Sequence, residues 1–482
     1  MKTYHKNFSF HSISPFDFFS SLIKDQNAVL LDSAEQRQKI GDYSYVLWGE
    51  RSSFRAYGKR CEIQLTRKKE TRQGNPFLLF QDFFNRVKSK PNKKYPYFTS
   101  GCVGFFGYDT NAFLEKVPNP KSDPELSFFP DVYFFVPKNV IIFDHQKGKI
   151  RLFVHGGSQE KFNELSLKIK NFLKAGFQKN SSETPEIKVD SIRPKMKQKQ
   201  FEAIVRRAKE YIAAGDIYQA NLSQRFSFHY EGDPLSLYQK LREINPSPFA
   251  SYWRMNDFHI VSSSPERLIR VRNGWCETRP IAGTRRRGKN SQEDGNLSKE
   301  LLLNEKEKAE HLMLVDLERN DLGRVCDYRT VTVDEWMVLE KYSHVIHIVS
   351  NVKGKLSKTK NNFDAIRSLF PGGTITGCPK IRSMEIIHEL EPVRRALYTG
   401  SIGYLGFDGN MDLNIVIRTI LCSEDKGYIQ VGAGIVQDSI PKKEYEETIY
   451  KAQAMLQAIH KTKETKKKRS RLHHPLSSVG RG

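Results

Sequence analysis

The chain has 482 residues, of which 38% are hydrophobic and 28% charged, enough to bury the core of one large domain or of two to three ordinary ones. Its mean hydropathy is −0.58, and its most apolar stretch, 131–143, is interrupted and far shorter than the roughly 20 residues of a membrane-spanning helix. The six cysteines are scattered without a C-x-x-C pair, which argues against a disulfide framework or a structural zinc site. No signal peptide is apparent in MKTYHKNFSFHS, so we expect a cytoplasmic globular protein.

The formal net charge is +23, from 78 Lys and Arg against 55 Asp and Glu. The segment 461–482 holds eight basic residues and one Glu, a net +7, which leaves +16 to the rest. We expect this segment to be a disordered basic tail. Such an excess favours anionic partners, namely nucleic acid, an acidic protein surface or an anionic small substrate, but a solvated basic surface alone would also account for it.

Three segments follow one another along the chain. Residues 1–177 are rich in aromatic and β-branched runs, 178–199 form a polar connection, and 200–460 mix helical and strand patterns. In the third segment the patterns predict helices at 200–214, 304–317 and 442–459, and strands at 259–263, 346–352, 414–421 and 428–431. Strands and helices do not alternate regularly, which favours an α+β fold. The first and third segments could be separate domains or one interleaved fold.

Two of the predicted helices carry acidic pairs at a spacing of three residues, Glu307 with Glu310 and Glu444 with Glu447. Residues three apart share one face of a helix. If the two helices converge, four carboxylates would surround one point and suit a hard cation such as Mg²⁺. Spacing alone, however, is more typical of solvent-facing charges on amphipathic helices.

Two glycine-rich turns, Gly372-Gly373-Thr374 and Gly432-Ala433-Gly434, could bind anions through backbone N–H groups, although most such turns are only turns. Arg418 lies within a predicted apolar strand, and a buried arginine needs an anionic partner. His347 also lies on an apolar run, where a histidine is more often a core residue than a catalyst.

Taken together, the motifs between residue 216 and about 460 are far more specific than any one of them. They include DIYQANLSQRF, SSPERL, ETRPIAGTRRRG, AEHLMLVDLERNDLGRV, SHVIHIVS, FPGGTITGCPKIRSMEIIHELEPVRR, GSIGYLGFDGNMDLNIVIRT and GAGIVQDSIPKKEYEET. The chain resembles the chorismate-utilising enzymes anthranilate synthase component I and aminodeoxychorismate synthase component I. LLDS at Leu30–Ser33 and GCVGFFGYD at Gly101–Asp109 extend the likeness more weakly to the N-terminal segment. The resemblance implies large mixed or antiparallel sheets packed with helices, a regulatory or structural domain at 1–177 and a chorismate-binding catalytic domain at 200–460.

The resemblance also implies roles for individual residues. Glu310 and Glu447 match the family's Mg²⁺ ligands, with Glu307 and Glu444 close by. The residues matching those that bind chorismate are Gly283, Thr284, Thr374, Tyr398, Arg418, Gly432, Ala433 and Gly434. The positions matching those linked to catalysis are His347, Gln219, Glu266 and Ala282. Mg²⁺, arginine and backbone N–H groups would together stabilise the charge that develops as the C4 hydroxyl leaves.

Under this resemblance, the residue at position 219 indicates whether water or ammonia attacks chorismate. Isochorismate and salicylate synthases of the superfamily have a lysine there to activate water, and glutamine cannot act as a base at neutral pH. Ammonia is therefore expected. No segment resembles a glutamine amidotransferase, because the nearest candidate for its G-x-C-x-G turn, Gly101–Gly104, lacks that spacing. We expect a separate glutaminase subunit, with free ammonia as a substitute at high concentration.

The motifs divide between two products. Many aminodeoxychorismate synthases first attack C2 of chorismate with the lysine of P-I-K-G-T, and Ala282 in PIAGT cannot form that adduct, which favours anthranilate. GGTITGCPK at 372–380, TGSIGYL at 399–405, SSSPERL and LLDS favour aminodeoxychorismate. Because some aminodeoxychorismate synthases use the PIAGT form, we favour that product and keep anthranilate as the alternative.

The tryptophan feedback site of the family usually reads L-L-E-S and P-S-P-Y-M. Ser33 and Pro248 match it, whereas Phe249 and Ala250 replace tyrosine and methionine. The smaller side chain of Ala250 would lose packing against an effector, so these residues do not predict tryptophan inhibition. A nucleic-acid-binding protein is a remote alternative suggested by the charge, but the chain has no recognisable binding motif. We expect neither a membrane nor a specific nucleic-acid partner.

Overall fold

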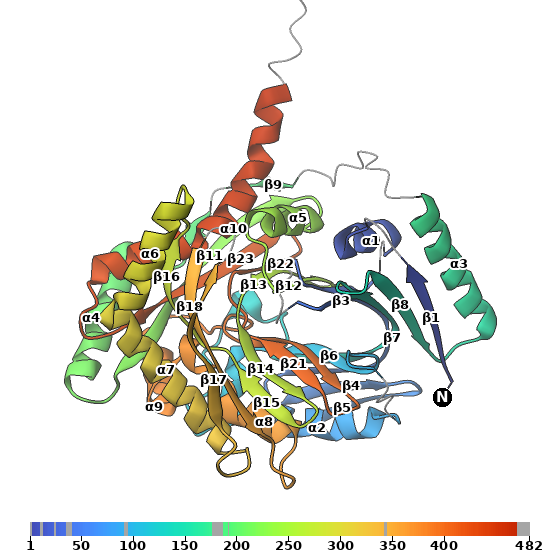
Figure 1. Cartoon of the computed structure of the whole chain (residues 1–482), viewed down its shortest axis with the longest axis horizontal. Helices are drawn as coiled ribbons and strands as arrows, with labels where there is room; N and C mark the ends of the chain where they lie inside the picture. Colours follow the sequence, from blue (N-terminus) through green and yellow to red (C-terminus); the bar gives the residue numbers. More distant parts are fainter. Residues whose placement is uncertain are drawn as a thin grey trace, which may run out of the picture.

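Two long strands take part in both sheets of the fold. Strands β3 (Tyr43–Tyr57) and β7 (Val132–Asp144) pair antiparallel along most of their length, with a register shift between Glu50 and Ser52. On one side of this shift they pair with β2 and β8, and on the other side with β4 and β6. Irregular pairing of this kind bends a strand. Each of the two strands therefore contributes to two sheets, whose inner faces share one hydrophobic cluster (Figure 1).

The computed structural model describes residues 2–9, 13–23, 26–34, 41–90, 95–175, 187–190, 192–341 and 345–469. The first sheet runs in the spatial order β1 (Thr3–Ser9), β8 (Lys149–His155), β7, β3, β2 (Ala28–Asp32), β12 (Phe249–Arg254), β13 (His259–Ser264), β22 (Thr419–Ser423), β23 (Lys426–Ile435) and β11 (Gln219–Glu231). The short strands that pair with β11 are β9 (Lys188–Val189), β10 (Arg193–Pro194) and β19 (Gly377–Cys378).

The second sheet runs in the order β5 (Lys68–Gln73), β4 (Arg60–Leu65), β3, β7, β6 (Gly101–Phe106), β20 (Ser401–Gly406), β21 (Met411–Asn414), β14 (Arg267–Arg272), β15 (Trp275–Thr278) and β18 (Val345–Lys355). Two further strands, β16 (Ile281–Arg286) and β17 (Thr332–Lys341), pair with β18. All of these pairs are antiparallel, so the predicted α+β class with large antiparallel sheets is confirmed.

Helices cover the outer faces of both sheets. Those on the first sheet are α1 (Pro15–Leu22), α3 (Gln159–Ala175), α5 (Leu235–Ile244) and α10 (Pro441–Arg469). Those on the second sheet are α2 (Pro76–Val87), α7 (Glu305–Gly323) and α8 (Asn362–Leu369). Helices α4 (Gln198–Ala213) and α9 (Lys380–Leu390) pack on β11, and α6 (Ser291–Leu303) packs on β18. The remaining short helices are η1 (Tyr108–Phe113), η2 (Pro124–Leu126) and η3 (Gly373–Ile375).

The N-terminal and C-terminal segments share both sheets. In the first sheet β2 pairs with β12, and in the second sheet β6 pairs with β20. Between the sheets, Phe105 of β6 contacts Trp253 of β12, with ring centroids 5.8 Å apart. Residues 1–177 and 200–460 are therefore interleaved in space, which was one of the two arrangements that the sequence left open.

Most predicted elements of the third segment have counterparts, with two corrections. The helices at 200–214, 304–317 and 442–459 correspond to α4, α7 and α10, and the strands at 259–263, 346–352 and 428–431 to β13, β18 and β23. The predicted strand 414–421 is two strands, because the chain turns between Asn414 and Thr419 and Arg418 has a φ of 52°. Helix α10 continues to Arg469, so it includes the first part of the segment expected to be a disordered tail.

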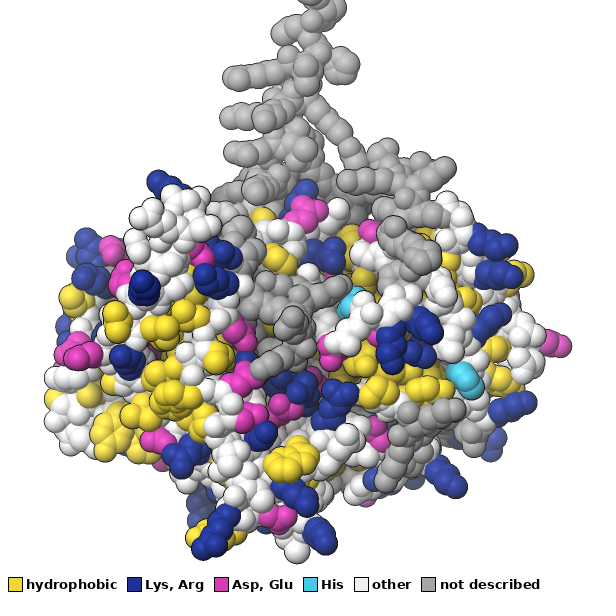
Figure 2. All heavy atoms as spheres, viewed as in Figure 1, with side chains coloured by type: hydrophobic (Ala, Val, Ile, Leu, Met, Phe, Trp, Pro, Cys, Tyr) yellow, Lys and Arg dark blue, Asp and Glu magenta, His cyan; other side chains and the backbone are white. Residues whose placement is uncertain are grey.

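Residues 470–482 of the expected tail, and 178–186 and 191 of the expected connection, lie outside the described residues. Among the residues that are described, no helix has both the length and the apolar character needed to cross a bilayer. Figure 2 shows Lys and Arg side chains spread over one face and mixed with Asp and Glu. On this face the positive charge does not form one continuous patch.

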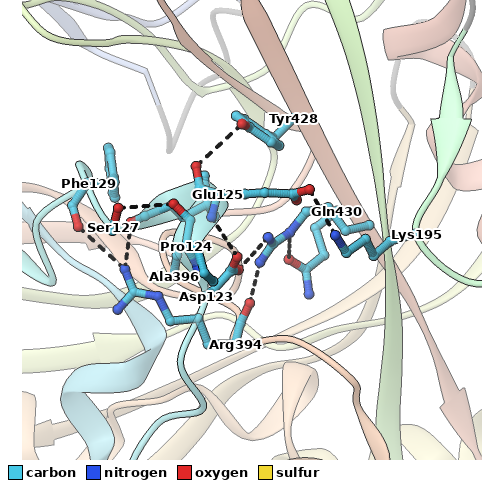
Figure 3. Close-up of polar contacts among 12 residues, drawn as sticks. Asp123, Pro124, Glu125, Ser127, Phe129, Lys195, Arg394, Ala396, Tyr428 and Gln430 are labelled. Carbon is cyan, nitrogen blue, oxygen red and sulfur yellow. Dashed lines mark hydrogen bonds and ion pairs between the residues drawn. The ribbon is translucent and has the colours of Figure 1, made fainter.

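A buried network fastens the segment around η2 to the first sheet (Figure 3). Asp123 and Arg225 form an ion pair at 2.6 Å, and their side chains are only 3% and 2% exposed. Tyr428 donates a hydrogen bond to the carbonyl oxygen of Glu125, at 3.3 Å. Arg394 donates to the carbonyl oxygen of Leu126, at 2.9 Å. The network thereby holds β11, β23 and the segment after α9 in one relative position.

Candidate active site

Strand β11 places the amide side chains of Gln219 and Asn221 against two glycines of β23, Gly434 and Gly432. Gln219 donates a hydrogen bond from Nε2 to Glu310 Oε1 of α7, at 3.3 Å. A Cβ atom on Gly434 would lie 2.6 Å from that Nε2 and 4.0 Å from Glu310 Oε1. Gly434 therefore leaves the space in which Gln219 reaches across β23 to α7. The glutamine and the glutamate, predicted for different roles, are in direct contact.

Gly432, two residues earlier on β23, opens a second space. A Cβ atom there would lie 2.5 Å from Asn221 Oδ1 and 2.8 Å from the hydroxyl oxygen of Tyr398. The carbonyl oxygen of Gly432 accepts a hydrogen bond from Lys451 Nζ, at 3.2 Å. The predicted substrate residues Gly432 and Tyr398 thus come together, and Asn221 and Lys451 join them. Ala433, between the two glycines, is buried and packs with α4 and α9 instead.

The sequence reasoning did not find Asn221 or Lys451. Lys451 lies four residues after Glu447 on α10 and forms an ion pair with it at 2.7 Å. Because KKEYEETIYK is predicted to be helical, the i,i+4 spacing of these two residues was a signal for this pair. Asn221 is two residues after Gln219 on β11, and residues at that spacing point to the same face of a strand. Their roles follow from partners on β23 that only the sheet register reveals.

The acidic residues of α7 and α10 face a common region but do not form the four-carboxylate cluster that the sequence suggested. Glu307 pairs with Arg285 Nη1 at 3.1 Å, and Glu447 pairs with Lys451. Within the described ranges, no group of three or more His, Cys, Asp or Glu side chains is placed to hold a metal ion. The helices nevertheless share charged neighbours, because the positive charges of Lys306 and Lys451 lower the pKa of both Glu310 and Glu444.

Glu310 is a half-buried carboxylate with charged neighbours of both signs. Burial raises its pKa, the charge of Glu307 raises it further, and Lys451, the Gln219 amide and Lys306 oppose this shift. Burial also raises the pKa of Glu444, against a hydrogen bond from Ser439. Mg²⁺ prefers oxygen ligands, keeps several waters and commonly uses only one or two protein carboxylates. The donor types of Glu310 and Glu447 fit that chemistry without a larger cluster.

Strand β16 places Gly283 and Thr284 beside His347. The His347 Nδ1 atom lies 3.0 Å from Thr284 Oγ1 and 3.3 Å from the carbonyl oxygen of Gly283. A carbonyl can only accept, so this contact favours the tautomer with the proton on Nδ1, which makes Nε2 the basic atom. Gly283 has a φ of 66° at a register shift, and a Cβ atom there would lie 3.0 Å from Glu307 Oε2. Ala282, just before it, is buried.

Glu266 is a buried carboxyl whose pKa is raised to near neutral pH. Its side chain accepts a hydrogen bond from Thr374 Oγ1 at 2.8 Å. Burial raises its pKa to about 7, although the Thr374 hydroxyl, the backbone of Ile281, Arg418 and Lys451 all favour the ionised form. Such a group can donate a proton at physiological pH. Thr374 and Arg418, both predicted to bind substrate, thus also favour the ionised form of Glu266.

Arg418 occupies a turn instead of the strand predicted for it. It is partly exposed, and its Nη1 lies 3.4 Å from Asn245 Oδ1. A second buried acid, Glu318 of α7, was not predicted. Burial raises its pKa well above the usual range, and the negative charges of Asp321 and Glu266 act in the same direction. Glu318 lies in the charged run DLERND, which offers no signal that separates it from a surface charge.

The four residues predicted for an effector site lie together. Ser33, Pro248, Phe249 and Ala250 all line one cavity of about 110 Å³. Ser33 Oγ donates to the carbonyl oxygen of Tyr43 at 2.9 Å, and the Arg267 guanidinium lies 5.1 Å from the centroid of the Phe249 ring. The other lining residues include Tyr97 and Arg270. Gln219, Glu310 and Gly434 are not among the residues that line this cavity.

Comparisons with known proteins agree with this geometry. The family model for chorismate binding enzymes matches residues 26–457. An anthranilate synthase component I-like protein of Synechocystis is 51% identical, over 75% of this chain and 73% of its own length. Aminodeoxychorismate synthase component 1 of Bacillus subtilis is 45% identical, over 82% and 84%. Anthranilate synthase component 1 of Aquifex aeolicus is 40% identical, over 94% and 93%.

A solved structure gives the same result. Anthranilate synthase component I from Streptococcus pneumoniae superposes with a TM-score of 0.76 at 34% identity, over 92% of this chain and 98% of its own. The chain therefore belongs to the family of chorismate binding enzymes. Within that family it is a chorismate-utilising enzyme of the anthranilate synthase and aminodeoxychorismate synthase type.

Proposed function

We propose that this chain aminates chorismate at C4, forming 4-amino-4-deoxychorismate on the route to p-aminobenzoate and folate. Ammonia would come from a separate glutamine amidotransferase subunit. The observation that carries the amination is Gln219, whose amide is anchored to Glu310 and which offers no base to activate water. The choice of C4 is supported by the motifs at 372–380 and 399–405, and by the 45% identity to the Bacillus subtilis aminodeoxychorismate synthase component.

The described residues suit the steps of such a reaction. Glu266 would protonate the departing C4 hydroxyl, because it holds a proton near neutral pH and Thr374 orients its carboxyl group. His347, oriented by Gly283 and Thr284, would present its Nε2 atom to the same region. Tyr398, Lys451 and the Gly432 backbone would hold substrate oxygens. Ala282 offers no nucleophile, so ammonia would attack without a covalent enzyme adduct at that position.

We further propose that Mg²⁺ is the cofactor, held by Glu310 and Glu447 with Glu307 and Glu444 nearby. When bound, the ion would supply positive charge to neutralise a substrate carboxylate. The half-buried position of Glu310, whose side chain accepts a hydrogen bond from the neutral amide of Gln219, supports this assignment. A carboxylate in that environment is stabilised by a cation.

Anthranilate synthase component I remains the second candidate. Ala282 favours it, as does the 40% identity to the Aquifex aeolicus enzyme over 94% of this chain. In that reaction ammonia adds at C2 and pyruvate is eliminated, so the two candidates differ in the fate of the enolpyruvyl group.

A product assay distinguishes them. The purified chain is incubated with chorismate, Mg²⁺ and ammonium salt, with and without aminodeoxychorismate lyase, and the products are separated by chromatography. p-Aminobenzoate that forms only with lyase supports C4 amination, whereas anthranilate in either tube establishes the second candidate. Glu310→Gln should abolish metal-dependent turnover and weaken Mn²⁺ binding. Near-normal turnover or Mn²⁺ binding in that variant would contradict the metal assignment.

A further inference from the structure

Asn221 carries a buried amide whose oxygen has no partner. The residue is 9% exposed, and its Oδ1 atom has no hydrogen-bond partner in the part of the chain that the structure describes. Nearly all buried polar side-chain atoms in folded proteins are paired, because an unpaired one has lost its hydrogen bonds to water without a replacement. An unpaired amide next to a predicted substrate site therefore calls for a ligand or another explanation.

The amide oxygen lies at a point where three elements meet. It is 2.5 Å from the position of a Cβ atom on Gly432 of β23, and the Tyr398 hydroxyl oxygen is 2.8 Å from the same position. Any side chain at 432 would occupy this point. Tyr398 itself is partly exposed. The glycine thus lets an amide and a hydroxyl, both of which can donate and accept, come close to the same point of β23.

One buried arginine holds both groups in place. Arg395 donates to the backbone carbonyl of Asn221, and its guanidinium lies 5.6 Å from the centroid of the Tyr398 ring. It also donates to the carbonyl oxygen of Ile375 at 2.9 Å, next to Thr374. The backbone N–H of Asn221 donates to the carbonyl oxygen of Thr376, at 2.8 Å. Asn221, Tyr398 and the Thr374 segment are therefore held as one unit before substrate arrives, which reduces the cost of binding.

We propose that Asn221 is a substrate-binding residue whose amide, together with the Tyr398 hydroxyl, holds one oxygen atom of the substrate above Gly432. This inference rests on the proposed chorismate amination. A substrate hydroxyl would donate to Oδ1 as it stands, and a carboxylate would accept from the amide after a half-turn of the side chain. Either way, the substrate satisfies the unpaired amide.

Two variants of similar size test the contact. Asn221→Leu removes both polar atoms, and we expect the KM for chorismate to rise roughly 10- to 100-fold. Its thermal midpoint should stay near that of the wild type, because an apolar side chain replaces a polar group that has no partner. Asn221→Asp keeps only acceptors. It should bind chorismate more weakly than the leucine variant if the partner is a carboxylate, and more tightly if it is a hydroxyl.

Ser223→Ala is the matched control. Ser223 lies on the same strand, but its hydroxyl donates to Glu391 at 2.8 Å and accepts from Gln430 at 2.8 Å, so it is already satisfied within the protein. This variant should lose stability and keep its KM. A KM within twofold of the wild type in Asn221→Leu would overturn the proposal and leave Asn221 with a packing role. Failure of the wild type to convert chorismate with ammonia would instead contradict the proposed amination itself.

Discussion

Glu266 shows how the surroundings of a single residue change its chemistry. Burial raises its pKa to about 7 even though Thr374, Arg418 and Lys451 all favour the charged form. Because the pKa in the folded protein lies above the usual value, the proton is held through the range between them and lost as the pH rises through about 7. The free energy of unfolding changes in the same direction with pH. This carboxyl stabilises the folded state at acid pH, and the contribution is lost as the pH rises through about 7.

Glu266→Gln should lower kcat for chorismate by roughly 100-fold or more, because glutamine cannot donate a proton to the leaving hydroxyl. In the wild type, kcat/KM should fall as the pH rises above about 7, with the concentration of free ammonia held constant. That alkaline decline should be absent from the residual activity of the variant. An unchanged pH profile would show that another group donates the proton.

At the scale of elements, the segment around η2 is attached to β11 by a buried ion pair and to Lys195, just after β10, by an exposed one. Asp123–Arg225 is almost completely buried, whereas Lys195–Glu125, at 2.8 Å, has side chains 41% and 39% exposed (Figure 3). A buried charge that loses its partner pays the full cost of desolvation, while an exposed one remains hydrated. The two pairs therefore contribute very differently to the same attachment.

Asp123→Asn should lower the free energy of unfolding by about 3–5 kcal/mol, because it leaves the Arg225 guanidinium without a negative partner. Lys195→Ala should lower it by about 1 kcal/mol or less. Urea denaturation followed by fluorescence would measure both. Similar losses in the two variants would mean that the attachment does not depend on the buried charge.

Elements were predictable where a local pattern decides them. The α10 motif KKEYEETIY predicted a helix, and the apolar run of β13 predicted a strand. The run 414–421 is equally apolar, yet the chain turns at Arg418 and passes from β21 in the second sheet to β22 in the first. Periodicity within eight residues contains no information about a change of sheet, so this boundary could not be read from the sequence.

For the whole molecule, the basic C-terminal segment is the feature least connected with the site. Segment 461–482 carries a net +7, and the described buried side chains of α10 end at Ile459. In Figure 1 the end of α10 projects away from the two sheets. From its charge we expect this segment to make electrostatic contacts with polyanions.

Removing residues 461–482 should leave chorismate turnover unchanged and lower the salt concentration at which the protein elutes from heparin, because fewer cations contact the polyanion. Removing only 470–482, which contains two arginines, should have a smaller effect. Unchanged elution after the larger truncation would show that the basic residues of the body bind the polyanion.

The sequence by itself determined the family and most of the helices of the third segment, because these depend on motifs and short-range periodicity. The same motifs predicted Gln219, Glu266, His347 and Glu310 as site residues. Only the tertiary structure decided which side chains meet. Asn221 faces Gly432 because β11 and β23 pair in one register, and Lys451 reaches the same glycine from α10. The first contact joins residues more than 200 positions apart, and the second joins a helix to a strand. Both arise from strand pairing and helix packing in the first sheet, and no local pattern of residues encodes them.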